Sequence, residues 1–407
     1  MSKNEKVKLR RSLGLSLVSL YGLGNILGAG IYVLVGKVAE AAGTSTTLAF
    51  LGAMVLASIT AFSYMELSGR YPISAGVSIY LHKAFGKKWL SLSTGLILVG
   101  AGVASAAALA QGFAGYLSEL APVPVWLASV GLIVVLGVVA MKGIGESAKT
   151  AAAFTAVEVL GLLLVIWFGR HAFSTVDTHT LLSLDPQLGF AGLVAGTFLA
   201  FYAFIGFEDM VNVAEEVKNP RRTMPFAILI SLAAATILYL LVVVVATNLV
   251  PTSELAESKA PLSLVLGASG VANAHLLSVI GMVATMNGVI VQIIMGSRIL
   301  YGLSNQGWLT PKLAVVSNKT NTPIVATLVV LAAMVAATLL LPLVSLAKLT
   351  SLLILIIFVF VNVSLIVVKR RQPKGSSSIT VWPALPYVGA VMSALVILYQ
   401  LVSWSVL

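Results

Sequence analysis

The sequence predicts an all-α polytopic membrane protein, because of its composition, its long apolar segments and the placement of its basic residues. Of the 407 residues, 59% are hydrophobic and only 10% are charged, a balance that soluble domains of this length do not have. Eleven apolar segments are each long enough to cross a bilayer. They lie near residues 13–35, 46–67, 90–117, 124–141, 147–168, 189–212, 225–249, 272–303, 323–341, 344–368 and 383–406.

The lysines and arginines predict how these segments are oriented. If the N-terminus is cytoplasmic, 21 of the 25 basic residues fall on the inner side of the membrane. The four exceptions are Lys37, Arg170, Lys259 and Lys348. Because basic residues accumulate in cytoplasmic loops, we predict a cytoplasmic N-terminus and a multi-pass location in the plasma (inner) membrane. The same bias accounts for the net charge of +11 without a nucleic-acid partner.

Composition and motifs argue against an enzyme. The chain has no cysteine, which excludes thiolate catalysis and a disulfide-linked subunit. It contains no phosphate-binding loop, nucleophile elbow or zinc-protease motif, and its four histidines lack the spacing of metal ligands. We therefore expect no catalytic residue, no metal site and no cofactor except a coupling ion, with a proton as first choice and sodium as the alternative.

The first apolar segment is interrupted by Gly24, Gly28 and Gly30. Glycine is a poor helix former, and a broken helix at membrane depth is tolerated where it lines a cavity or is buried in protein. Many secondary transporters build their substrate site in this way. Amides of Ala29 and Gly30, at the start of the second half-helix, can hold a carboxylate, and the Ile26 carbonyl can accept from an ammonium group. The alternative is close helix packing through the G-x-x-x-G pair.

The sixth apolar segment has a similar interruption at Gly206, which lies among aromatic residues and precedes Glu208 and Asp209. If the chain is a repeat of five spans, this segment corresponds to the first one. Paired interruptions at corresponding positions are a strong sequence indication of a transporter site. Taken alone, the segment fits a plain helix with a packing glycine.

Glu158 lies halfway along the fifth apolar segment. An ionisable group at this depth is costly, so a functional role is the default hypothesis. A carboxyl group that is protonated on one side of the membrane and deprotonated on the other can couple proton and substrate movement. The alternative is a neutral carboxyl group that bonds a neighbouring helix. In the eighth segment, Thr285 forms a stripe of small and polar residues with Gly281, Gly288 and Gln292. Such a stripe is typical of close packing against a neighbouring helix, and the alternative is that it faces the first interruption.

Several motifs occur in an order that resembles the amino acid–polyamine–organocation (APC) superfamily. They are Gly-Asn-Ile-Leu-Gly-Ala-Gly-Ile at 24–31, Tyr-Met-Glu-Leu-Ser-Gly-Arg-Tyr-Pro at 64–72, the region 204–225, and Ser-Arg-Ile-Leu-Tyr at 297–301. Residues 145–148 are similar to the start of the fifth span in bacterial relatives of cationic amino-acid transporters.

This resemblance implies a leucine-transporter-type fold with spans 1 and 6 unwound. Residues 1–12 would form a cytoplasmic segment, 13–168 the first five-span repeat, 189–369 a second, inverted repeat, and 383–407 an additional span. The resemblance implies that residues of both interruptions bind the substrate, and that the aromatic residue and the acid of span 6 act as gates. The implied substrate-binding residues are Ile26, Gly28, Ala29, Gly30, Tyr202, Ala203 and Ile205, and the implied gate residues are Tyr202 and Glu208.

Two residues depart from the superfamily's pattern. Ala29 stands where the family has a serine, which leaves only backbone amides for the substrate carboxylate. Glu158 stands where several proton-coupled relatives carry a lysine, so the acid itself carries the proton or helps to hold a cation. Together with Thr285, Glu158 is our candidate for ion coupling.

These observations predict a secondary active transporter that moves amino acids across the plasma membrane by alternating access, with proton-coupled uptake. Its partners would be the amino-acid substrate and the lipid bilayer. The alternatives are an uncoupled amino-acid exchanger and, in a different class, a non-transporting nutrient sensor. The sequence leaves the substrate class open, because Glu208 suits a cationic side chain and a pocket around Ser105 and Gln111 suits a neutral one.

Overall fold

The computed structural model describes most of the chain, and in that part it contains helices and no strand. One isolated pairing joins Leu13 to Val217, with the Leu13 amide donating to the Glu216 carbonyl and the Lys218 amide donating back to Leu13. The described residues are 11, 13–28, 30–73, 76–142, 148–176, 181, 183–271, 273, 275–317, 320, 322–373, 375 and 377–405.

The helices follow the predicted apolar segments to within a few residues, and short helices lie between them. The long helices are α3 (Thr46–Arg70), α5 (Lys88–Ser118), α6 (Val125–Met141), α7 (Ala148–Phe168), α11 (Pro220–Leu249), α14 (His275–Asn305), α15 (Ile324–Leu340), α16 (Leu343–Arg371) and α17 (Leu385–Ser405). The half-length helices are α1 (Leu15–Leu27), α2 (Gly30–Ala42) and α10 (Gly189–Phe201). The short ones, which the sequence did not predict, are α4 (Gly76–Phe85), α8 (Ala172–Thr175), α12 (Thr252–Glu257) and α13 (Pro261–Ala268).

Length and composition support a membrane protein. Within the described residues, seven helical stretches are long and apolar enough to cross a membrane, and one of these, Leu15–Arg70, includes α1, α2 and α3. The helices α6, α15 and the 152–168 part of α7 are apolar but shorter. The span count of eleven therefore stays a prediction.

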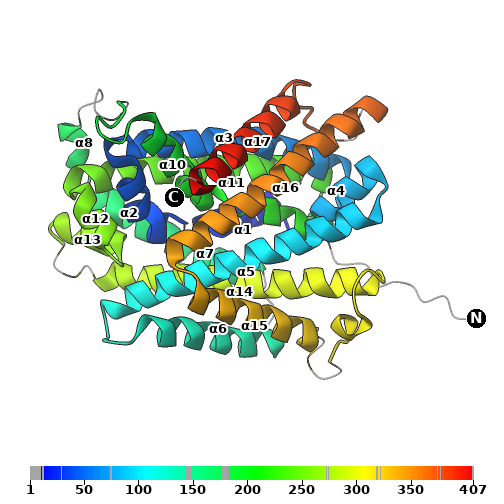
Figure 1. The fold of residues 1–407 in the computed structure, drawn as a ribbon, viewed down its shortest axis with the longest axis horizontal. Helices are drawn as coiled ribbons and strands as arrows, with labels where there is room; N and C mark the ends of the chain where they lie inside the picture. The colour runs from blue at the N-terminus through cyan, green and yellow to red at the C-terminus, as the bar shows by residue number, and fades with distance from the viewer. Residues whose placement is uncertain are drawn as a thin grey trace, which may run out of the picture.

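The helices form two groups (Figure 1), and both α7 and α16 contact helices of each group. In one group α5 lies along α14 and also packs against α16, α15 and α6. In the other, α1 packs against α11, and α10 packs against α3. The helix α7 touches both α1 and α14. Figure 1 shows α2, α8, α12 and α13 at one end of the long helices, and α4 at the other.

The helix α11 begins before Pro225, where the apolar segment was predicted to start. Proline inside a helix leaves the carbonyl four residues earlier without its amide donor. Here that carbonyl belongs to Arg221, and it accepts hydrogen bonds from the Ser378 amide (3.3 Å) and the Ser378 hydroxyl (2.9 Å). The segment after α16 thus supplies the missing donors, which lets the helix continue through the proline.

An aromatic cluster fixes the middle of span 6 against its neighbours. Phe201 and Phe207, which flank the interruption, both contact the Phe358 ring of α16 at centroid distances of 5.5 Å. Phe207 also meets Tyr64 of α3 at 5.6 Å in an edge-on geometry. Such ring pairs add stabilisation beyond the area that they bury, so the cluster holds the unwound segment in place.

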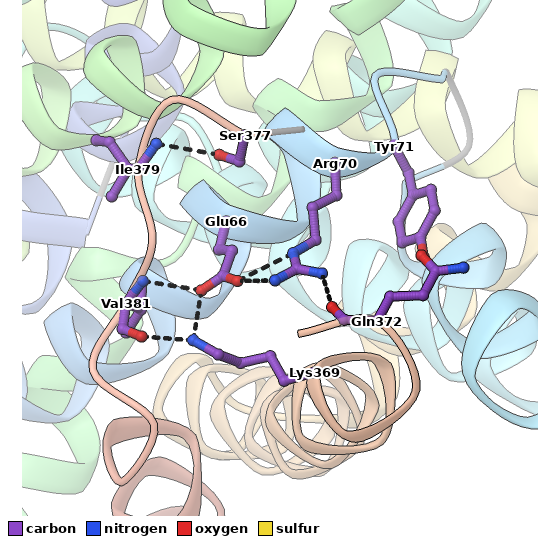
Figure 2. Close-up of polar contacts among 8 residues, drawn as sticks. All are labelled: Glu66, Arg70, Tyr71, Lys369, Gln372, Ser377, Ile379 and Val381. Atoms are coloured by element: carbon purple, nitrogen blue, oxygen red, sulfur yellow. Dashed lines mark hydrogen bonds and ion pairs between the residues drawn. The ribbon is translucent and has the colours of Figure 1, made fainter. Parts of the chain in front are cut away.

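A buried carboxylate joins the end of α3 to α16 and to the segment before α17 (Figure 2). The Glu66 side chain is fully buried, and it accepts hydrogen bonds from Arg70 Nε at 2.9 Å and from Lys369 Nζ at 2.9 Å. The Val381 amide donates to the same carboxylate at 2.8 Å. Arg70 in turn donates to the Gln372 carbonyl at 2.7 Å. Because two cations and an amide surround one buried anion, three segments that are distant in sequence depend on Glu66.

A second polar contact joins the 43–45 turn to the start of α10. Asp185 Oδ1 accepts from the amides of Gln187 and Leu188, both at 2.9 Å, and Oδ2 accepts from the Thr44 amide at 3.0 Å. Hydrogen bonds that favour the charged form lower the pKa of a carboxyl group. The bonds from Leu188, Thr44 and Gln187 lower the pKa of Asp185 from 3.8 to about 2.

We expect Glu66→Gln to destabilise the protein strongly, because it leaves the buried Arg70 and the partly buried Lys369 without their counter-charge. Removing one partner of a buried ion pair costs about 3–5 kcal/mol. Thermal unfolding in detergent, followed by size-exclusion chromatography, measures the effect. The matched control is Glu40→Gln, which removes the exposed Lys37–Glu40 pair and should cost no more than about 1 kcal/mol. Equal melting shifts in the two variants would contradict this role for Glu66.

We expect the stabilisation by Asp185 to depend on pH. Because its folded-state pKa is lowered, the contribution is complete above the unfolded value, about 3.9, and is lost as the pH falls toward about 2. Asp185→Asn should therefore lower the melting temperature at pH 7, and its difference from the native protein should shrink below about pH 4. A difference that stays constant from pH 7 to pH 3 would show that the charge of Asp185 is not responsible.

Candidate functional site

Both predicted interruptions are present. The helix α1 ends at Leu27 and α2 begins at Gly30, while Ala29, between them, lies outside the described residues. In the sixth segment α10 ends at Phe201 and is followed by two 3₁₀ helices, Tyr202–Phe204 and Phe207–Glu216. Two helices are thus broken near their middles.

The two interruptions lie directly against each other. Gly206 has a φ of 132°, which L-residues rarely adopt, and a Cβ there would overlap the Asn25 carbonyl. A Cβ on Gly30 would overlap the backbone of Ala203. Glycine is therefore required on both sides of the contact, and the residues predicted from two distant segments form one site.

The Tyr239 hydroxyl group of α11 lies within hydrogen-bond distance of a carbonyl group from each interruption. It lies 2.7 Å from the Ile26 carbonyl oxygen and 2.9 Å from the Ala203 carbonyl oxygen. Carbonyl groups at membrane depth need such donors. Sequence analysis did not single out Tyr239, because a tyrosine in an apolar helix carries no local signal of what it contacts.

A small central cavity of about 40 Å³ lies where the interruptions meet. Of the predicted binding residues, Ile26, Gly28, Gly30, Tyr202 and Ile205 line it, whereas Ala203 lies behind it against Gly30. Polar side chains from four elements complete its wall; they are Asn25, Ser105, Asp209, Asn287 and Gln292.

The predicted aromatic gate residue forms part of the wall of this cavity. Tyr202 is 5% exposed, and its hydroxyl oxygen lies 3.1 Å from the Ser105 hydroxyl oxygen on α5. Gln111, which the sequence placed in the same pocket, instead donates to the Thr338 and Leu341 carbonyls, both at 2.9 Å. The interaction between Tyr202 and Ser105 thus joins the interrupted sixth segment to the other helix group.

A larger vestibule of about 600 Å³ lies beside the central cavity, toward the start of the chain. Leu13 and Gln306 are among its lining residues, and Asp209 lines both spaces. Glu208 lines the vestibule but not the central cavity, and its Oε2 accepts from the Gly206 amide at 2.9 Å. The two neighbouring acids of span 6 therefore lie between cavity and vestibule.

The opposite end of the cavity is closely packed. Gly36 of α2 lies against the Leu255 carbonyl, and Gly115 of α5 lies against the Lys259 carbonyl. The Tyr116 hydroxyl donates to the Tyr32 carbonyl at 2.6 Å. The short helix α12 and the segment after it thus close this end, while the vestibule widens the other.

Glu158 is fully buried beside the first interruption. Its Oε1 accepts from Asn287 Nδ2 of α14 at 3.0 Å, and its main-chain carbonyl accepts from the Tyr32 hydroxyl of α2. One turn earlier, the Thr155 hydroxyl donates to the Leu20 carbonyl of α1 at 3.1 Å. Glu158 therefore lies at the junction of α7 with the broken span and with α14.

Thr285, the other predicted coupling residue, is buried but bonds within its own helix. Its hydroxyl group lies 2.9 Å from the carbonyl oxygens of both Gly281 and Met282. The residue of α14 that contacts Glu158 is Asn287, which sequence analysis passed over. An asparagine in the middle of an apolar helix was the available signal, since buried polar groups need partners.

This arrangement defines a multi-pass membrane transporter with two interrupted helices around a central cavity. Sequence comparison agrees, because the profile of the amino acid permease family matches residues 13–405. The chain belongs to this family, which is part of the APC superfamily suggested by its motifs, and it is therefore a transporter and not an enzyme.

Named relatives cover nearly the whole chain. The branched-chain amino acid permease BcaP of Bacillus subtilis is 30% identical over 389 residues, which are 90% of this chain and 82% of that permease. Cationic amino acid transporter 4 of Mus musculus is 30% identical over 399 residues, or 92% of this chain. The chain spans only 62% of the length of that mouse transporter.

Solved structures agree on the fold. A manganese transporter of Eremococcus coleocola superimposes with a TM-score of 0.67, covering 98% of this chain and 90% of that one. The two sequences are only 13% identical, so the likeness concerns the fold alone.

We expect Gly206→Ala to destabilise the protein and to abolish transport, because its Cβ would overlap the Asn25 carbonyl and its φ would be strained. Strain of this kind alone costs about 1–3 kcal/mol. The control is Gly131→Ala in α6, where a Cβ meets nothing within 4 Å and alanine favours the helix by up to about 1 kcal/mol. Melting temperature and uptake into proteoliposomes test both variants. Native-like uptake by the Gly206 variant would show that the contact between the interruptions is dispensable.

Proposed function

We propose that this protein is a secondary active transporter of α-amino acids that works by alternating access and takes up substrate together with protons. The observation that carries this proposal is the contact of the two interrupted helices beside a polar cavity. Membership of the amino acid permease family supports amino acids as the substrate, and so do relatives that are named as amino-acid permeases and transporters.

The substrate's α-groups match the chemistry of the interruptions. The start of α2 at Gly30 offers backbone amides and the positive end of a helix dipole to a carboxylate. The ammonium group would lie near the carbonyls of Ile26, Tyr202 and Ile205. Ile26 already accepts a bond from Tyr239, but a carbonyl oxygen has a second lone pair for the substrate.

Asp209 favours a cationic substrate side chain. Among the described residues that line the central cavity, it is the one carboxylic acid. The relatives named above include both a branched-chain permease and a cationic amino acid transporter, so the substrate panel below decides between the two classes.

Helix contacts support two inverted five-span repeats within eleven spans. The first half of span 1, α1, packs against α11 of span 7, and the first half of span 6, α10, packs against α3 of span 2. Each first half thus packs against a helix of the opposite repeat, which is the arrangement that an inverted repeat produces. With a cytoplasmic N-terminus in the plasma membrane, the vestibule faces the cytoplasm, and the conformation is inward-facing.

Transport from this conformation requires movement of the cavity wall. A volume of about 40 Å³ holds only a few water molecules, so an amino acid needs more room. Breaking the contact between Tyr202 and Ser105 would let the interrupted sixth segment move away from α5 and admit the substrate. Glu208 and Asp209 would then form the cytoplasmic boundary of the site.

Coupling is assigned to Glu158. It is fully buried next to the first interruption, where the rocking of α1 against α7 can alternately expose it to the two sides. Ionisable side chains at membrane depth commonly serve as proton relays. Its Oε1 accepts from the neutral amide of Asn287, which is compatible with both the ionised and the protonated carboxyl group.

The test is uptake of a panel of labelled amino acids into proteoliposomes, with and without an inward proton gradient. Accumulation of one class that depends on the gradient supports the proposal. Uptake only into vesicles preloaded with amino acid would identify an uncoupled exchanger. Binding without any transport would identify a nutrient sensor, and dependence on a sodium gradient would identify sodium as the coupling ion.

We expect Glu158→Gln to lose gradient-driven accumulation and to keep exchange of external for internal amino acid. Glutamine preserves the size of the side chain and can still pair with Asn287, but it cannot release a proton. The control is Glu119→Gln, which alters an exposed acid at the end of α5. Full accumulation by the Glu158 variant would refute the coupling role, whereas loss of both accumulation and exchange would point to a purely structural one.

A further inference from the structure

Asn287 connects the buried carboxyl group of Glu158 to the substrate cavity. It lines the central cavity, whereas Glu158 does not. Its Nδ2 donates to Glu158 Oε1 at 3.0 Å, and the side chain is only 4% exposed. The Oδ1 atom of Asn287 is buried and has no hydrogen-bond partner among the described residues. Since such an atom is costly to leave unsatisfied, a partner is expected in another state of the transporter.

The amide can respond to the protonation state of Glu158. An ionised carboxylate only accepts hydrogen bonds, so it takes the NH₂ group of Asn287, while a protonated carboxyl group can also donate one to Oδ1. These two polar groups lie on opposite edges of a planar amide. When one turns toward Glu158, the other turns away from it, and a half-turn of the amide exchanges them.

We propose that Asn287 is the positioning residue that transmits protonation of Glu158 to the substrate. When Glu158 is protonated, its hydroxyl group donates to Oδ1, and the NH₂ group turns to the cavity to donate to the substrate carboxylate. When Glu158 is ionised, it holds the NH₂ group, and the substrate loses that donor. Substrate therefore binds more tightly at low pH, which is the linkage that proton-coupled uptake requires.

Asp209 lines the same cavity as Asn287, and the Glu158→Gln variant below separates its contribution from that of Glu158. Few other titratable groups face this pair. Tyr32 of α2 and Tyr239 of α11 interact electrostatically with Glu158. The adjoining helices α1 and α13 carry no Asp, Glu, Lys, Arg or His. On α14 itself, His275 and Arg298 are three turns or more from Asn287. The phenol groups remain neutral below about pH 10, so the inference assigns the pH response to Glu158 and thereby rests on the proposed function.

The experiment measures equilibrium binding of labelled L-arginine and L-leucine to the purified full-length protein at pH 5.5 and pH 8. Allosteric couplings typically change an affinity by about 5- to 150-fold, so we expect the native protein to bind its substrate at least about 5-fold more tightly at pH 5.5. Asn287→Leu, which keeps the side-chain size, should reduce this ratio to less than about 2-fold, and so should Glu158→Gln.

The control is Gln292→Leu, which alters another polar side chain of α14 that lines the same cavity. Its affinity should fall at both pH values, with the native ratio preserved. Asn287→Asp provides a second variant. Two adjacent carboxyl groups share a proton and titrate at higher pH, so the pH at which affinity changes should move upward.

The possible outcomes separate this inference from the proposed function. If Glu158→Gln removes the pH dependence but Asn287→Leu keeps it, Glu158 remains the coupling group and Asn287 is not its transmitter. If Glu158→Gln keeps the pH dependence, the coupling proposal itself fails, and this inference fails with it. If Asn287→Leu is not monodisperse by size-exclusion chromatography, Asn287→Asp decides, since an unchanged pH profile in that variant overturns the inference.

Discussion

The structure depends on one constraint, which is that backbone groups freed by a broken helix at membrane depth must find partners. Here the two breaks satisfy this requirement together. Gly206 and Gly30 let the two backbones touch, and the Tyr239 hydroxyl group serves carbonyls from both sides. The aromatic cluster of Phe201, Phe207 and Phe358 holds the unwound part of span 6 in place. Because these groups lie around the meeting point of the two breaks and do not fill it, a cavity remains there.

The two fully buried acids, Glu66 and Glu158, differ in their surroundings. This difference distinguishes a structural acid from one proposed to be functional. Glu66 bonds two cations and a backbone amide, an arrangement that suits an anchor for three segments. Glu158 Oε1 accepts from the amide of Asn287, which can pair with either protonation state. This difference supports the proposed proton-carrying role for Glu158 and not for Glu66, although both are fully buried.

The two ends of the cavity differ: one is closely packed, and the other adjoins the vestibule. This difference is relevant to the proposed transport cycle. At one end the carbonyls of Leu255 in α12 and of Lys259 after it lie against glycines of α2 and α5, and at the other a vestibule reaches the acids of span 6. A carrier must be able to reverse this asymmetry. The side-chain contact between Tyr202 and Ser105 joins the two helix groups at the cavity, so it can break without unfolding either group.

By itself, the sequence determined the membrane class, most helix boundaries and the two interruptions, because hydrophobic length and glycine placement act locally along the chain. It also identified Glu158, since a lone acid in an apolar segment is visible without a structure. Only the tertiary structure placed Tyr239, Asp209 and Asn287 at the site, and it moved Gln111 away from it. Tyr239, Asn287 and Gln111 sit on regular α-helices, and Asp209 sits in a 3₁₀ helix. The local pattern of each is the same whether the side chain faces lipid, a neighbouring helix or the cavity. Their partners lie on other helices, so only the packing of those helices decides their contacts.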